Sequence, residues 1–143
     1  MTDKMFMSML DSASKKKLTS INFASFMRIL IQGYSEDLGL LGLYAVENGC
    51  TMILTAGTPD RKILNFLTNR EYYYKLKRNM PPSNREKVNA QLFSCRRIIN
   101  NVLDDESIAG ICFNATENNH VTVEKEILTA YIQEGLLVKI MDQ

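Results

Sequence analysis

The sequence predicts an α+β (mixed α/β) fold: a small mixed sheet built from two hairpins plus single strands, with helices packed against it. Stretches with apolar residues at helical spacing alternate along the chain with short apolar runs of strand length. Two pairs of such runs are separated by asparagine-containing turns, as in hairpins. No run leads into a glycine-rich phosphate loop, so a doubly wound nucleotide-binding fold is excluded.

Length and composition indicate a single domain over residues 1–143. The chain is 45% hydrophobic and has a formal net charge of +1, which is close to average globular usage. Its three cysteines are widely spaced, so we expect neither a disulfide framework nor a zinc site. No apolar stretch approaches the ~18–20 residues of a membrane span, and the N-terminal lysines follow the apolar residues, unlike a secretory signal. We therefore expect a cytoplasmic protein without a membrane-bound part.

Two helices are expected in an N-terminal segment, residues 1–34. The first runs from Thr2 to about Ala13, and the second follows Thr19 or Ser20, either of which is a plausible N-cap. Gly33 is expected to close the second helix. Apolar residues at helical spacing in the two helices are Met5, Phe6, Met9 and Leu10, and Phe23, Phe26, Met27 and Leu30.

The next elements are a hairpin and a short helix. Runs 40–46 and 50–55 flank Glu47-Asn48-Gly49, and Asn-Gly readily adopts the positive φ of a hairpin turn. Thr58-Pro59-Asp60 resembles a helix start, because a hydroxyl cap, proline at the first position and an acid in the first turn all favour it. Residues 72–77 fit either a strand or a continued helix, and the alternation of the tyrosines favours the strand.

The second half contains the clearest helical pattern. Ser83 and Glu86 form a capping box, and a stripe spaced by four and three residues predicts one helix from residue 83 to 102, with Leu92 in its buried face. Run 108–113 is expected to be a central strand covered on both faces. It should pair with a short strand at 120–123 through the Asn114–His120 bend, which we expect to face solvent and to have no chemical role, because asparagine favours turns. A last helix should end at Gly135, before a possible short strand at 136–140. The predicted stripe of the 83–102 helix is Val88, Leu92, Cys95, Ile99 and Val102.

Two segments resemble parts of a known family: "TMILTAGTPDRKILNFL" (51–67) and "NVLDDESIAGICFNATENNHVTVEKEILTAYI" (101–132). They are similar to the N-terminal domain of the SseB-like family, the enhanced serine sensitivity proteins. Gly110, Ile111 and Asn114 match the family's Gly-Ile-Val-Ile-Asn-Pro strand, whereas Ala115 replaces its proline and Ala56-Gly57-Thr58 replaces its Phe-Thr-Ser turn. The resemblance implies an SseB-like α/β core over residues 40–143, of bacterial or phage type, and supplies no catalytic residues.

Candidate reactive groups are few. His120 is the only histidine, and Cys112 lies in an apolar run where a buried, inert thiol is expected. The acidic cluster Asp104, Asp105 and Glu106 lacks the further oxygen ligands of a calcium loop. We therefore predict no catalytic, cofactor-binding or metal-binding residues, and a protein that is not an enzyme.

Charge is distributed unevenly along the chain. Residues 61–97 carry ten bases and two acids, residues 98–143 carry two bases and eight acids, and residues 1–60 carry five bases and six acids. Such asymmetry can mark a binding face or be paired internally, and both interpretations remain open. The predicted partner-binding residues are Tyr73, Lys75, Lys77, Arg78, Arg85, Arg96 and Arg97.

These observations favour a non-enzymatic module that binds an acidic surface on another protein. A neutralising protein or an adaptor would be a module of this kind. Nucleic-acid binding through residues 70–97 is the alternative, because tyrosines among cations could stack on bases. A small enzyme is the third possibility. On the single helix predicted for 83–102, Arg85 and Arg96 are almost three turns apart and would share a face.

Overall fold

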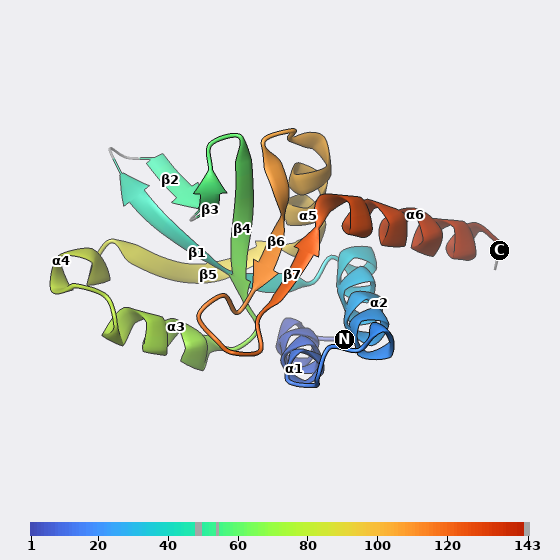
Figure 1. The fold of residues 1–143 in the computed structure, drawn as a ribbon, viewed down its shortest axis with the longest axis horizontal. Coiled ribbons are helices and arrows are strands. Elements are labelled where there is room, and N and C mark those ends of the chain that lie inside the picture. Colours follow the sequence, from blue (N-terminus) through green and yellow to red (C-terminus); the bar gives the residue numbers. More distant parts are fainter. Residues whose placement is uncertain (48–49, 54, 142–143) are drawn as a thin grey trace.

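Six helices pack against a mixed sheet in the computed structural model, which describes residues 1–47, 50–53 and 55–141 (Figure 1). This architecture confirms the predicted α+β fold. The helices are α1 (Asp3–Ser14), α2 (Ser20–Glu36), α3 (Arg70–Arg78), α4 (Pro82–Arg85), α5 (Cys95–Asp104) and α6 (Lys125–Met141). The strands are β1 (Gly39–Glu47), β2 (Cys50–Ile53), β3 (Thr55–Thr58), β4 (Arg61–Leu67), β5 (Val88–Ser94), β6 (Ile108–Phe113) and β7 (Val121–Glu124).

Strand β1 organises the sheet, because both of its edges are used. Antiparallel β5 follows one edge from Gly39 to Ala45. The other edge pairs with β4 at Leu41 and Gly42 and with β2 further along. Strand β4 pairs with β3 on the edge facing β1, and with parallel β6 on its opposite edge, while β7 completes the sheet beside β6.

Alternation along β1 divides the buried apolar residues between two cores, as expected for a strand with both faces covered. Leu40 belongs to the larger core, where α1, α2, α5 and α6 cover the sheet. Leu41 and Leu43 belong to a smaller core on the opposite face, together with Tyr73 of α3 and Val88 of β5.

The N-terminal helices begin where the sequence predicts. The hydroxyl of Thr2 accepts the Met5 N–H at 3.1 Å, and that of Thr19 accepts the Asn22 N–H at 3.2 Å. The predicted stop at Gly33 is wrong, because α2 continues to Glu36 and ends at Asp37 in the left-handed region, with φ 51°. Gly33 instead makes room for a neighbouring ring, since a Cβ there would lie 2.2 Å from Phe6 Cζ.

The hairpin predicted at 40–55 is confirmed by the pairing of β1 with β2, although Asn48 and Gly49 lie outside the described residues. The predicted helix after Thr58 is wrong. Residues 61–67 form β4, and Pro59-Asp60 is the turn of a second hairpin in which Thr58 pairs with Arg61. Proline followed by aspartate suits turns as well as helix starts, and pairing with β1, β3 and β6 selects the strand.

Residues 72–77 belong to helix α3, so the preferred strand is wrong. The side chain of Asn69 caps this helix by accepting the Glu71 N–H at 2.9 Å. Tyr73 and Leu76 both contact the smaller core at a spacing of three, which is typical of one face of a helix, and Met80 packs there just after the helix ends.

The single helix predicted for 83–102 is two helices with a strand between them. A spacing of four residues is even, so Val88 and Leu92 share a face of a strand as readily as a face of a helix, and β1 supplies the pairing edge. Leu92 is therefore 44% exposed and not a core residue. Only the second half of the pattern is a helix: α5 buries Cys95, Ile98, Ile99 and Val102, and Ser94 caps it.

The C-terminal hairpin is confirmed, with β6 and β7 antiparallel and β6 almost wholly buried. The predicted helix end at Gly135 and the strand at 136–140 are wrong, because α6 continues to Met141. One glycine costs a helix only ~1 kcal/mol relative to alanine. Of the described helices, none has both the length and the apolarity needed to cross a membrane.

Candidate functional site

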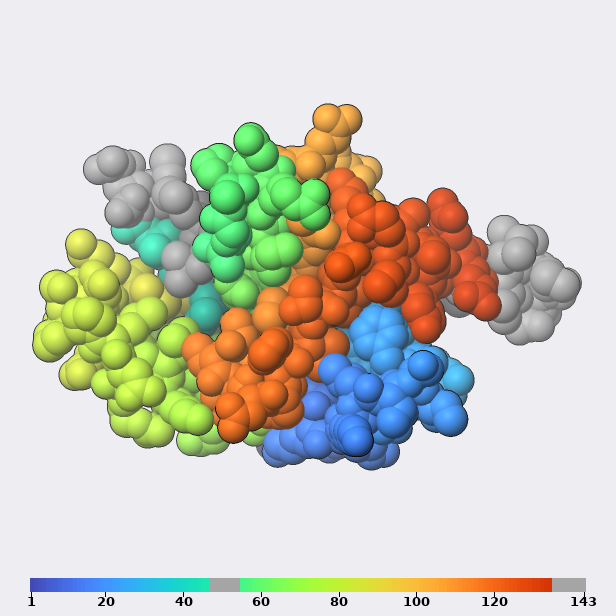
Figure 2. All heavy atoms as spheres, viewed as in Figure 1, coloured from blue at the N-terminus to red at the C-terminus, as the bar shows by residue number. Residues whose placement is uncertain are grey.

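The most distinctive surface of the described chain is a group of six cationic side chains on α3, α4 and the residue before β5. We call this group the basic face: Arg70, Lys75, Lys77, Arg78, Arg85 and Lys87. Only Glu71 and Glu86 oppose them between residues 70 and 87, which leaves a local charge of +4. Figure 2 shows α3 and α4 at one end of the molecule, and Figure 1 shows the same two helices beside the sheet.

Helical periodicity decides which side chains of α3 reach solvent. Tyr73 is only 7% exposed and donates its hydroxyl hydrogen to the Val88 carbonyl at 3.3 Å. Tyr74, one residue later, is 43% exposed and shares its face with Arg78, one helical turn further on. The basic face therefore carries an exposed aromatic ring among its cations, while Tyr73 is structural.

Three members of the basic face are engaged within the chain. Lys75 forms an ion pair with Glu117 of the β6–β7 loop at 3.2 Å, and the Lys77 Nζ lies 5.5 Å from the centroid of the Tyr73 ring. Arg85 donates from Nε to the Met80 carbonyl at 3.2 Å and from its terminal nitrogen to the Arg78 carbonyl at 3.1 Å. Arg85 therefore fastens α4 to the end of α3.

Arg96 and Arg97 do not belong to the basic face, so the predicted site is not one surface. They lie on α5, beyond the seven residues of β5, and seven strand residues span roughly 23 Å. Arg96 donates to the Tyr34 carbonyl at 3.1 Å and also to that of Ser35, which satisfies carbonyls at the end of α2. The helix face expected to unite Arg85 and Arg96 does not exist.

Arg70, Lys87 and Tyr74 are the members of this surface that the sequence analysis missed. Both cations lie inside the basic stretch 61–97, so local charge pointed to them. Tyr74 could be recognised only after α3 was known to be a helix, since a strand would place Tyr73, not Tyr74, on the face opposite Tyr72.

Few cations of the basic face pair with acidic residues of the same chain. Within the described residues, Lys75 is the one cation of the basic face that forms an ion pair with a carboxylate. Within the acidic cluster at 104–106, Asp105 accepts hydrogen bonds from the Ser107 N–H and hydroxyl, which lower the pKa of its carboxyl. The basic face therefore presents its charge mostly to solvent.

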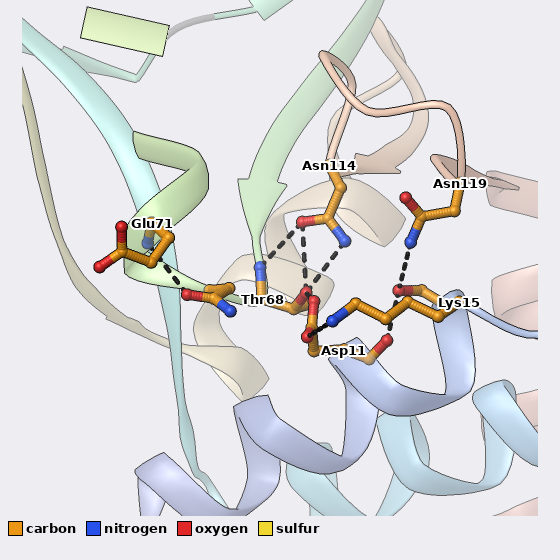
Figure 3. A network of polar contacts seen from close by, with 8 residues as sticks. Asp11, Lys15, Thr68, Glu71, Asn114 and Asn119 are labelled. Carbon is orange, nitrogen blue, oxygen red and sulfur yellow. Dashed lines mark hydrogen bonds and ion pairs between the residues drawn. The ribbon is translucent and has the colours of Figure 1, made fainter. Parts of the chain in front are cut away.

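A second polar cluster, drawn in Figure 3, joins α1, the end of β4 and the β6–β7 loop. Thr68 donates its hydroxyl hydrogen to Asp11 Oδ1 at 2.9 Å and accepts from Asn114 Nδ2 at 2.9 Å, while its backbone N–H donates to Asn114 Oδ1 at 3.0 Å. All three residues are buried. No buried side-chain nitrogen or oxygen of the described residues lacks a hydrogen-bond partner, so this cluster is satisfied within the fold.

Ionisation in this cluster follows from its contacts. Burial by itself would raise the pKa of Asp11, but hydrogen bonds from Tyr72, Lys15 and Thr68, together with the Lys15 charge, outweigh burial and hold the pKa below its ordinary value. Burial and the hydrogen bond to Asp11 raise the pKa of Tyr72, and the same carboxylate raises the pKa of Lys15, whose Nζ lies 3.1 Å from Asp11 Oδ2. The cluster keeps Asp11 anionic and fastens three elements together.

The Asn114–His120 bend is not wholly solvent-facing, which corrects the prediction for its first residue. Asn114 is fully buried with φ 61°, a left-handed conformation that asparagine tolerates better than most residues. His120 is exposed, as predicted, and its Nδ1 lies 3.1 Å from the Glu117 carbonyl. The bend is therefore anchored at its first residue and open at its last.

Cys95 and Cys112 are buried thiols. Burial, aided by the nearby Asp37 charge, raises the pKa of Cys95 to about 12, so its reactive thiolate is scarce at neutral pH. Cys112 lies opposite Thr122 in the β6–β7 ladder and is 8% exposed. Among the described residues, no group of three or more histidine, cysteine or acidic side chains is placed to hold a metal ion.

Comparison with family models, with curated proteins and with solved structures finds no match for this chain. The SseB-like resemblance therefore stays a prediction.

Proposed function

We propose that this protein is a small cytoplasmic, non-enzymatic module that binds an acidic surface of another protein through its basic face. One observation carries the proposal: five cations and an exposed tyrosine lie on α3 and α4 and a sixth cation directly precedes β5, and a single cation among the six has a carboxylate partner in the described part of the chain. Arginine and tyrosine are enriched at protein interfaces, and lysine more often lies at the rim. A neutralising or adaptor role would use such a surface.

Nucleic acid is the competing ligand, because a cationic surface with an exposed aromatic ring could also hold phosphates and bases. The charge of the whole chain favours a protein partner. Net charge is only +1, and residues 98–143 carry eight acids, whose field opposes the approach of a long polyanion.

The test reverses charge on the exposed end of α3. In the double variant Lys77→Glu/Arg78→Glu, we expect an acidic partner captured by the wild-type chain, identified and purified, to bind at least tenfold more weakly, about 1.4 kcal/mol. The matched control is Lys16→Glu/Lys17→Glu, an adjacent lysine pair directly after α1 that undergoes the same charge change and should keep wild-type affinity. Circular dichroism must show that both variants are folded.

Two results would reject this function. Full retention of the partner by the folded Lys77→Glu/Arg78→Glu variant would remove the basic face from binding. Tighter binding of a fluorescent single-stranded DNA or RNA, with affinity falling steeply as salt rises, would assign the face to nucleic acid, because phosphate contacts release counterions.

A further inference from the structure

Strand β5 is an unprotected edge of the sheet. It pairs with β1 in seven consecutive registered positions without a bulge, and no other described strand pairs with its outer edge. Edge strands are usually shielded by charged residues, proline or bulges, because their free N–H and C=O groups invite another strand. The β5 sequence, Val-Asn-Ala-Gln-Leu-Phe-Ser, contains neither charge nor proline.

Two hollows flank this edge, one on each face of the sheet. The first, about 690 Å³, lies between α1 and the start of α3 and includes Met7, Arg70 and Leu92. The second, about 490 Å³, lies between β5 and α5 and includes Phe93, Arg97 and Ile98. Leu92 borders both hollows and is 44% exposed. Side chains of an added strand would alternate between the two faces, and each face has a hollow to receive them.

Free charge around the edge is positive. Lys4 and Arg70 line the first hollow, Arg97 lines the second, and Lys87 directly precedes the strand. None of these four side chains forms an ion pair or hydrogen bond with another described residue.

The first hollow also includes two carboxylates. Asp11 is paired with Lys15. Asp3 Oδ1, in contrast, accepts the neutral Gly39 N–H at 2.8 Å and keeps its negative charge, so the four cations still outnumber the unbalanced carboxylate. A second copy of this chain would place the same four cations against one another, and like charges at an interface are costly. The charge pattern therefore favours an acidic occupant.

We propose that the outer edge of β5 binds an extended segment with mixed acidic and apolar residues as an additional strand. Its backbone would pair with β5, its apolar side chains would enter the two hollows, and its carboxylates would meet Lys4, Arg70 and Arg97. This inference rests on the proposed function, because it names the part of the acidic partner that the sheet recognises.

The test uses a fluorescein-labelled peptide of two Glu-Glu-Val-Val repeats, which places glutamate and valine on both faces of a strand. Titration followed by anisotropy should show saturable binding to the full-length protein. Leu92→Glu should weaken binding at least tenfold, and Leu92→Val should keep it within about threefold. The same peptide N-methylated at its central residues should not bind, because it cannot form strand hydrogen bonds, and a Lys-Lys-Val-Val peptide should not bind either.

Backbone amide exchange locates the peptide. Protection that appears along 89–94 on binding supports strand addition. Equal affinity of the N-methylated peptide, or exchange changes confined to α3 and α4, would overturn the β5 site and leave the basic face untouched. A wild-type dimer in sedimentation that Leu92→Glu dissociates would also overturn it, because the occupant would then be a second copy. The Lys77→Glu/Arg78→Glu variant separates the two proposals. If it loses the partner but still binds the peptide, the basic face and the β5 edge bind independently.

Discussion

At the scale of single residues, the buried carboxylate of Asp11 has the largest consequence. Its neighbours come from α1, the end of β4 and α3, so its ionisation connects elements distant in the sequence. A buried polar group is expensive when it loses its partners and modestly favourable when all of them are present. All polar groups of the cluster have hydrogen-bond partners. Replacing Asp11 should therefore lower stability only at pH values where its carboxylate is charged.

We expect Asp11→Asn to lower the free energy of unfolding by ~1–3 kcal/mol at neutral pH. The folded-state pKa of Asp11 is lowered from 3.8, so its carboxylate stabilises the fold above that value, and the contribution is lost as pH falls through the folded pKa. The difference between wild type and variant should therefore shrink in acid.

Urea denaturation at neutral pH and at about pH 3 measures this difference. Asp60→Asn, in the exposed β3–β4 turn, is the control. Its stability difference from the wild type should not shrink in acid. If the difference in free energy of unfolding between wild type and Asp11→Asn stays constant down to about pH 3, Asp11 does not stabilise the fold through its charge.

At the scale of elements, the packing of α1 against α2 depends on Gly33. Alanine usually stabilises a helix relative to glycine by ~1 kcal/mol. Here its Cβ would lie 2.2 Å from Phe6 Cζ and 2.3 Å from Cε1, and Phe6 is completely buried. For Gly33→Ala, helix propensity therefore predicts a gain in stability, whereas the contact with Phe6 predicts a loss.

We expect Gly33→Ala to destabilise the protein by ~1–3 kcal/mol, the cost of overpacking a core. Phe6→Leu, which removes the ring, should cost less in the Gly33→Ala background than in the wild type. Thermal or chemical denaturation of the four members of this double-mutant cycle gives the coupling energy. A stabilised Gly33→Ala variant would mean that α1 and α2 separate easily.

At the scale of the whole molecule, the N-terminal helices are part of the main core. Phe6, Leu10, Phe26, Met27 and Leu30 are all fully buried, and the Phe26 ring lies 5.2 Å from that of Phe113 on β6. Burying one such side chain contributes ~1.5–3 kcal/mol, while a domain's entire stability is ~5–15 kcal/mol.

We therefore expect a chain that begins at Leu38 to lose cooperative unfolding and dispersed amide resonances. Met5→Lys is the control, because Met5 is 55% exposed on α1 and its replacement should leave the fold intact. A truncated chain with a sharp unfolding transition would show that residues 40–143 form an independent core.

Features that depend on residues close together along the chain can be predicted from the amino-acid sequence alone. Thr2 and Thr19 cap helices because a hydroxyl reaches N–H groups three residues away. The apolar run 108–113 and its asparagine bend specified the β6–β7 hairpin. All six cations of the basic face lie in the basic stretch 61–97, and four of them are among the predicted partner-binding residues. The α+β class followed from such local patterns.

Some segments have apolar patterns that fit a helix and a strand equally, and long-range packing selects between the two. Val88 and Leu92 share a face in both a helix and a strand, and the available edge of β1 made them a strand. Proline and aspartate at 59–60 fit a helix start and a hairpin turn equally, and the pairing of β3 with β4 selected the turn. Helix α3 likewise separated Tyr73 from Tyr74, and β5 separated Arg85 from Arg96. Strand pairing joins residues far apart in sequence, so its contribution to stability cannot be predicted from a short segment of the chain. The candidate binding surfaces depend on this pairing.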